Sequence, residues 1–284
     1  MIMTVRVLAS ESMGVRSYCT FFENNDISLI IDPGCALGPD RFKLPPHKME
    51  IEALWKSWDV INEHLKKSRI VVITHYHYDH HHYRNFALFR SKIVLLKDYT
   101  AVNPRQKRRA ELFVDLIKGF CEIIPADGKC LNFGDTKIEV TLPLSHGYEN
   151  EEVKIVGVYI RDKNTSLFYS SDISGLIEDY LMDFLSGKLV KTLIFDGFPT
   201  YLIDSKLRRE FLEESKIRLN ALIDRCGVET LIIDHHSARD LNWEFHYKEI
   251  LNRRDLRFCG NAAAYNGSEP LYLEARRRLI FGKE

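Results

Sequence analysis

The chain has 284 residues, of which 45% are hydrophobic and 28% charged, a composition that excludes intrinsic disorder and supports a sizeable core. Its 40 basic and 40 acidic residues cancel, so the net charge supports neither general nucleic-acid binding nor attraction to an anionic membrane. No apolar run is long enough to span a bilayer, and the six cysteines show no ligand-like spacing. We therefore expect a cytoplasmic protein whose metal ligands are nitrogen and oxygen atoms.

The first predicted elements are three strands, at residues 4–9, 15–22 and 28–31. The N-terminal ten residues fit a strand better than a signal peptide, because a basic residue interrupts the apolar run. The third strand ends in Asp32-Pro33-Gly34. Taken alone, Asp32 is most simply a turn aspartate that caps backbone amides.

An amphipathic helix is predicted next, at about residues 51–65, followed by a buried strand at residues 71–73. Directly after that strand, five imidazoles and one carboxylate fall within eight positions, in the order His75-Tyr76-His77-Tyr78-Asp79-His80-His81-His82. Neutral imidazole and carboxylate are the usual ligands of zinc and similar divalent ions. A histidine-rich surface tract explains this order at a strand end less well, so we expect a metal site here.

The middle of the chain alternates predicted helices with predicted strands. Helices are expected at residues 83–90 and 106–120, and strands at residues 92–96, 122–124, 129–133 and 136–142. The last of these strands runs into His146. A structural role would explain this lone histidine unless other ligands lie near it.

Two carboxylates compete for one position at the end of a strand. Asp172 ends the strand at residues 166–171, and Asp196 ends a later one. The number of residues between His146 and Asp172 is consistent with a hairpin that brings both residues to one sheet edge. We prefer Asp172, because the small serines beside it permit close approach to a metal, and we expect residues 197–201 to line a substrate pocket if Asp196 is not the ligand.

The last informative segment follows a long predicted helix at residues 205–226. A buried strand at residues 228–234 ends in Asp234-His235-His236-Ser237-Ala238-Arg239. Adjacent residues of an extended chain point to opposite sides, so only one of the two histidines is expected to bind a given metal. Helices at residues 242–253 and 271–279 complete the chain, and the run at residues 276–278 is most simply a solvated basic face.

The motif His75-Tyr76-His77-Tyr78-Asp79-His80 resembles the His-x-His-x-Asp-His signature of the metallo-β-lactamase fold superfamily. The superfamily's other motifs follow the same chain order as Asp32, His146, Asp172 and His235. The ending from His235 to Arg239 is similar to the His-x-Ser-x-Arg of the nuclease branches. That similarity favours His235 over His236 as the ligand and places Ser237 and Arg239 beside a substrate anion. The Leu44-Pro45-Pro46-His47 turn and the histidine motif together resemble a mainly archaeal branch of predicted hydrolases.

This resemblance implies an α/β (α+β) fold, a four-layer αββα sandwich, formed by one domain over residues 1–284. It also implies two divalent metal ions, zinc first, with iron or manganese as alternatives. Asp32 would orient the ligand side chains without binding a metal ion itself, and Asp172 would bridge the two ions. The remaining ligands would be His75, His77 and His146 for one ion, and Asp79, His80 and His235 for the other.

The function that the resemblance implies is hydrolysis by a metal-bound, bridging hydroxide, with Asp79 and Asp172 as catalytic residues. Arg239 favours phosphodiester or phosphorylated small-molecule substrates, and ester, lactone or thioester hydrolysis is the first alternative. A mononuclear iron oxidoreductase similar to persulfide dioxygenases is the second alternative, and a metal-stabilised binding protein without turnover is the third. The oligomeric state is not predicted.

Overall fold

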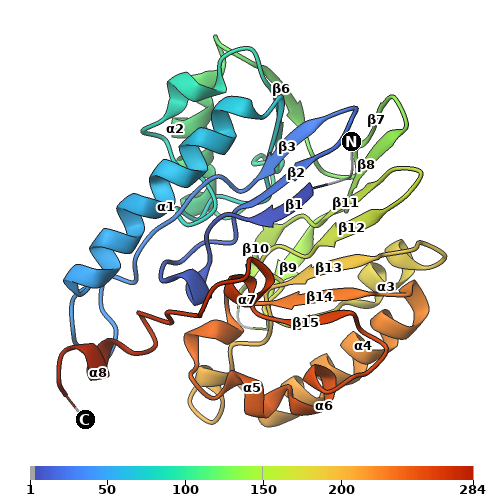
Figure 1. The fold of residues 1–284 in the computed structure, drawn as a ribbon. Helices are drawn as coiled ribbons and strands as arrows, with labels where there is room; N and C mark the ends of the chain where they lie inside the picture. Colours follow the sequence, from blue (N-terminus) through green and yellow to red (C-terminus); the bar gives the residue numbers. More distant parts are fainter. Residues whose placement is uncertain (1–3, 149, 284) are drawn as a thin grey trace. The chain divides into compact units, whose positions relative to one another are not determined.

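The computed structural model describes residues 4–148 and 150–283, and the chain divides into two compact units (Figure 1). The first unit comprises Met1–Asp127 and Pro270–Glu284, and the second comprises Gly128–Glu269. The expected single-domain organisation stays a prediction. Among the helices of the described residues, none is both long and apolar enough to cross a membrane.

The first unit is built on a six-stranded sheet in which strand order equals chain order. Strands β1 to β3 are antiparallel, whereas β3, β4, β5 and β6 run parallel. Parallel strands present their carboxyl ends at one edge, so the residues after β3 and β4 lie close together. The bounds are β1 (Thr4–Val7), β2 (Thr20–Glu23), β3 (Ser28–Ile31), β4 (Ile70–Ile73), β5 (Ile93–Leu96) and β6 (Glu122–Pro125).

Two long helices complete the core of this unit: α1 (Lys48–Lys67) and α2 (Pro104–Ile117). Their buried apolar side chains join those of the strands in one cluster, to which α1 contributes Ile61 and α2 contributes Phe113. All four residues of β4 are buried, as expected for a central parallel strand covered on both faces.

Two expected helices of the first unit are wrong. Residues 83–90 contain only a 3₁₀ turn at Phe86–Phe89, because aromatic stacking of Tyr83 on His82 and of Phe86 on Phe120 fixes the segment instead. Residues 271–279 contain only the short α8 (Arg277–Ile280).

Arg277, expected on a solvated face, is fully buried. Its guanidinium donates to Glu50 Oε1 at 2.6 Å and Oε2 at 2.8 Å, and to the carbonyls of Leu44 and Gly38. Glu50 is itself buried and also accepts a hydrogen bond from His47 N, which caps the start of α1. The C-terminal segment is therefore anchored inside the first unit by a satisfied buried ion pair.

The second unit contains a seven-stranded sheet in the order β15-β14-β13-β12-β11-β8-β7 and a separate pair of strands, β9 (Leu144–His146) and β10 (Asn150–Ile155). Strands β12 to β15 run parallel, so the carboxyl ends of β12, β13 and β14 share one edge. The bounds are β7 (Cys130–Phe133), β8 (Thr136–Val140), β11 (Val158–Arg161), β12 (Ser166–Tyr169), β13 (Thr192–Phe195), β14 (Thr230–Ile233) and β15 (Phe258–Gly260).

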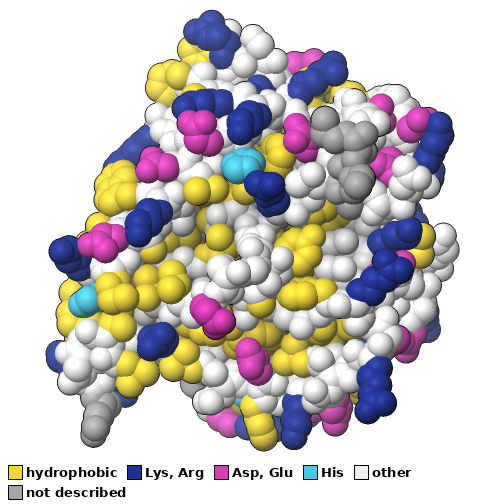
Figure 2. Space-filling model, viewed as in Figure 1, with side chains coloured by type: hydrophobic (Ala, Val, Ile, Leu, Met, Phe, Trp, Pro, Cys, Tyr) yellow, Lys and Arg dark blue, Asp and Glu magenta, His cyan; other side chains and the backbone are white. Residues whose placement is uncertain are grey.

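Helices α3 (Asp179–Leu185) and α4 (Arg209–Cys226) belong to the second unit, and α3 was not predicted (Figure 1). The helix expected at residues 242–253 is interrupted, and forms α5 (Trp243–His246) and α6 (Lys248–Leu251); α7 (Ala262–Tyr265) follows β15. On the face shown in Figure 2, basic and acidic side chains are interspersed, in keeping with the zero net charge.

Candidate metal centre

In the first unit, Asp32 ends β3 directly beside the end of β4. Its Oδ1 accepts a hydrogen bond from Thr74 N at 2.8 Å, and its Oδ2 accepts one from the Thr74 hydroxyl at 2.6 Å. Oδ2 also lies 2.9 Å from His80 Nδ1. Because Nδ1 of His80 faces this carboxylate, Nε2 is the nitrogen that His80 can offer to a metal. This geometry matches the predicted orienting role of Asp32, which remains a proposal.

The histidines of the motif are packed against one another. His75 Nε2 lies 3.0 Å from His77 Nδ1, and the ring centroids of His75 and His80 are 4.2 Å apart. His75 and His80 are fully buried. A metal binds the lone pair of a neutral imidazole, and this packing brings several such nitrogens together. Ligand atoms of Asp32, His75 and His80 all lie within 4.8 Å of one another.

His81 and His82 lie outside the motif and take supporting positions. His81 is buried beside Phe113, and its Nδ1 lies 3.0 Å from the carbonyl oxygen of His77. Burial lowers the pKa of His81 to about 3 and that of His82 to about 4. His82 packs on Trp58 of α1. Both rings are therefore neutral packing groups.

Helix α2 supports the histidine loop through residues that the sequence did not single out. Gln106 Oε1 accepts a hydrogen bond from Tyr76 N at 2.8 Å. Arg109 donates to the Tyr76 carbonyl at 3.2 Å and lies over the Tyr78 ring at 4.4 Å. A buried polar side chain in the first turn of the helix was the available signal for Gln106.

Gly34 approaches the histidine loop so closely that a side chain would not fit. A Cβ atom there would lie 2.5 Å from His81 N and 2.6 Å from His80 C. We expect Gly34→Ala to lower the free energy of unfolding by roughly 1–3 kcal/mol through overpacking, and to reduce metal content by displacing His80. Thermal melting and elemental analysis would measure the two effects.

Gly119→Ala is the matched control, because nothing lies within 4 Å of the added Cβ atom. Equal melting temperatures and metal contents for the two variants would contradict the proposed close approach.

In the second unit, Asp172 lies among three imidazoles. Its Oδ2 is 3.2 Å from His146 Nε2, 3.3 Å from His235 Nε2 and 3.8 Å from His236 Nε2. Asp172 and His235 are buried, and His146 is 7% exposed. A carboxylate shared by several imidazoles is the arrangement that a bridging ligand requires.

Asp196, the rival carboxylate, lies behind His236 instead. Its Oδ2 is 2.7 Å from His236 Nδ1 and accepts a hydrogen bond from Ser174 N at 2.6 Å. Burial, and then the charge of Asp172, raise the pKa of Asp196 well above its usual value. Asp196 therefore faces Nδ1 of His236 in the same way that Asp32 faces Nδ1 of His80.

The expectation that His235 and His236 point to opposite sides is wrong. His235 has a positive φ of 53° and His236 is helical, so the chain is not extended there. Both rings approach Asp172, and their centroids are 4.5 Å apart. Asp234, a residue not singled out, supports this turn: its Oδ1 accepts from His235 N at 2.7 Å and its Oδ2 from Ala262 N at 2.9 Å.

Backbone strain gathers at these strand ends. Asp32, Ser171, Ser174 and His235 all have φ between 48° and 56°, a region that non-glycine residues rarely occupy. Such conformations cost on the order of 1 kcal/mol each and persist only where surrounding contacts enforce them. The hydrogen bonds of Asp32 and Asp234 supply two such contacts, so the site residues are held rigidly.

A cavity of about 160 Å³ opens beside His146 and His236 in the second unit. Arg239 lines it and is 8% exposed, with Nη2 3.3 Å from His235 Nε2. Ser237 is fully buried and donates its hydroxyl to the Asp234 carbonyl at 3.2 Å. The other lining residues are Gly147, Tyr148, Ser174, Pro199, Tyr201, Leu202 and Leu207, so the loop after Asp196 borders the cavity as expected.

Comparison with known proteins gives one family match and close relatives. A family model described as the metallo-beta-lactamase superfamily matches residues 13–81, which include Asp32 and the histidine motif. The UPF0282 protein of Korarchaeum cryptofilum is 38% identical over 283 residues, covering 98% of this chain and 94% of the relative.

Two solved structures share the fold. The isothiocyanate hydrolase from Delia radicum gut bacteria has a TM-score of 0.54 and 12% identity, over 86% of this chain and 94% of that one. The metallo hydrolase Igni18 of Ignicoccus hospitalis has a TM-score of 0.50 and 14% identity, over 90% of this chain and 93% of the other.

Proposed function

Because the chain belongs to the archaeal UPF0282 family and to the metallo-β-lactamase superfamily, whose fold it has, we propose that it is a metal-dependent hydrolase of phosphodiester or phosphorylated substrates. The observation that carries the proposal is the position of Asp172 between His146 and His235, 3.2 and 3.3 Å from their Nε2 atoms. When bound, divalent ions supply Lewis acidity and activate water for attack near neutral pH.

We propose zinc as the metal, and each unit has its own set of proposed ligands. The first unit would contribute His75, His77, Asp79 and His80, and the second would contribute His146, Asp172 and His235. Neutral imidazoles and carboxylates form the donor set that zinc accepts, and iron and manganese accept it as well. Asp32 and Asp196 would fix the tautomers of His80 and His236 by facing their Nδ1 atoms.

Arg239 supports the choice of an anionic substrate. Its guanidinium lines the cavity that also contains His146 and His236. A guanidinium binds phosphoryl oxygens through paired hydrogen bonds and keeps its charge at every working pH. Tyr148 lines the same cavity and stays neutral, since burial raises its pKa to about 12. We therefore expect Arg239 to bind the phosphoryl group of the substrate, while neutral side chains enclose the rest of the substrate.

Elemental analysis of protein from its native source, followed by an activity screen, tests the proposal. We expect close to two divalent ions per chain and turnover of bis(p-nitrophenyl) phosphate in preference to ester and lactone substrates. His77→Ala should lose metal and at least about 100-fold in kcat/KM, because it removes a proposed ligand. His246→Ala is the matched control: this histidine lies in α5 and belongs to none of the groups of candidate ligands found among the described residues.

Three results would overturn the proposal. Turnover unchanged by His77→Ala would exclude the metal centre, and the absence of turnover on all substrates would exclude a hydrolase. One iron per chain with oxygen consumption would identify an oxidoreductase.

A further inference from the structure

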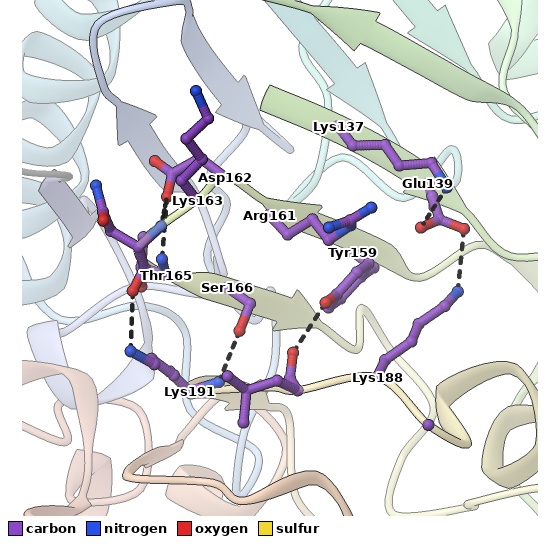
Figure 3. Close-up of a pocket in the computed structure, with 13 residues that line it drawn as sticks. Lys137, Glu139, Tyr159, Arg161, Asp162, Lys163, Thr165, Ser166, Lys188 and Lys191 are labelled. Atoms are coloured by element: carbon purple, nitrogen blue, oxygen red, sulfur yellow. Dashed lines mark hydrogen bonds and ion pairs between the residues drawn. The ribbon is translucent and has the colours of Figure 1, made fainter. Parts of the chain in front are cut away.

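A second cavity, of about 530 Å³, lies in the second unit (Figure 3). It is lined by Arg161 at the end of β11, by Ser166 at the start of β12, and by the loop that leads into β13. Asp172 follows the other end of β12, roughly 20 Å away along an extended strand. This cavity is therefore separate from the proposed metal centre.

Basic side chains dominate the cavity although the chain as a whole is neutral. Five basic and two acidic residues line it. Glu139 is shared by two of the lysines, with Lys137 Nζ at 3.0 Å and Lys188 Nζ at 3.1 Å. Lys163 is paired with Asp135, which is not among the lining residues. One carboxylate thus serves two cations inside the cavity.

The remaining two cations have no carboxylate within ion-pair distance among the described residues. Lys191 Nζ donates only to the backbone carbonyl of Asn164, at 2.9 Å. Arg161 is exposed and lies directly opposite Lys137 in the antiparallel pair of β11 and β8. Like charges directly opposite each other destabilise a sheet. Figure 3 shows Arg161 between Lys137 on the neighbouring strand and the loop that carries Lys188 and Lys191.

Lys137 is compensated by Glu139, whereas Arg161 has no carboxylate partner among the described residues, and an anion in the cavity would balance this positive charge. Arg161, Lys137 and Tyr159 share one face of the sheet, and the Tyr159 hydroxyl is already used, because it donates to the Leu189 carbonyl at 2.9 Å. Recognition must therefore come from the charged side chains. Guanidinium and ammonium groups that surround a cavity are suited to bind phosphate-type oxyanions. The volume of this cavity falls in the range of small-molecule binding sites.

We propose that this cavity binds a small anion carrying at least two phosphate-type groups, held by Arg161 and Lys137 on one side and by Lys188 and Lys191 on the other. A single phosphate would leave part of the volume and of the cations unused. The ligand supplies the negative charge that Arg161 and Lys191 lack, which offsets the cost of placing Arg161 opposite Lys137.

Isothermal titration calorimetry of the full chain with inorganic pyrophosphate tests this site. The Arg161→Gln/Lys191→Gln variant should bind at least about tenfold more weakly than the wild type, since two charge-assisted contacts are lost. Arg225→Gln/Lys248→Gln removes the same charge from exposed positions outside the cavity and should bind like the wild type. His77→Ala should also bind like the wild type, because the metal centre is separate.

Melting curves give a second readout. Without pyrophosphate, Arg161→Gln should melt at or above the wild-type temperature, because it relieves the repulsion from Lys137. With pyrophosphate, the wild type should gain stability and the double variant should not. Loss of binding in His77→Ala would place the ligand at the metal centre, and equal weakening in the control would indicate diffuse surface attraction. Either result, or no binding by the wild type, overturns the proposal.

Discussion

Replacing Asp172 by asparagine is expected to lower kcat/KM by about 1,000-fold or more and to reduce metal content, because the carboxylate lies within reach of three imidazoles. The amide keeps the shape of the side chain and removes its charge. Replacing Asp196 by asparagine should cost only about 10–100-fold, the effect of losing a carboxylate that orients a histidine. Steady-state kinetics with bis(p-nitrophenyl) phosphate would measure kcat/KM of each variant, and elemental analysis would measure its metal content.

The comparison of the two variants decides which carboxylate is the bridging ligand. Circular dichroism and melting temperatures establish that both variants are folded. If Asp196→Asn loses the metal while Asp172→Asn retains it, the assignment of Asp172 is wrong and Asp196 takes its place.

Replacing Arg277 by methionine is expected to lower the free energy of unfolding by roughly 3–5 kcal/mol, the cost of leaving a buried carboxylate without its partner. Arg277 is fully buried, and its guanidinium makes two hydrogen bonds to Glu50 and two to backbone carbonyls. Urea denaturation followed by circular dichroism would measure the loss. Arg278→Met is the control, since this neighbouring arginine is exposed.

A second substitution separates the buried charge from simple loss of packing. In the double variant Arg277→Met/Glu50→Gln no uncompensated charge remains, so it should recover a substantial part of the lost stability. A double variant no more stable than Arg277→Met alone would show that packing, not the unpaired carboxylate, sets the cost.

The strand ends that carry the candidate ligands could be predicted from the sequence. An apolar run that stops at a polar residue places Asp32, His75 and Asp172 at strand ends, and β3, β4 and β12 lie where the pattern indicates. The prediction of these strands succeeds because a parallel strand buried on both faces is a short run of apolar residues. Such a run is visible in the strand's own sequence without knowledge of its neighbours.

Features that depend on backbone conformation or on distant partners could not be predicted. The positive φ of His235, which turns both His235 and His236 toward Asp172, accompanies hydrogen bonds that Asp234 accepts from His235 N and from Ala262 N, and Ala262 lies far away in the sequence. Arg277 was expected on a solvated face, because a basic run gives no sign of a glutamate that lies far away in the sequence. The short helix α3 has too few turns to show clear periodicity.

The anchoring of Arg277 also bears on the order in which the chain matures during synthesis. The second unit is continuous in sequence, so all its residues have been synthesised before Arg277 is added. The first unit is made of two separate stretches of the chain. The Glu50 carboxylate has no guanidinium partner until Arg277 is synthesised more than two hundred residues later. Domains usually fold in the order of their synthesis. The unit whose synthesis begins first is therefore completed only after the whole second unit has been made, which leaves its core dependent on residues that follow the second unit.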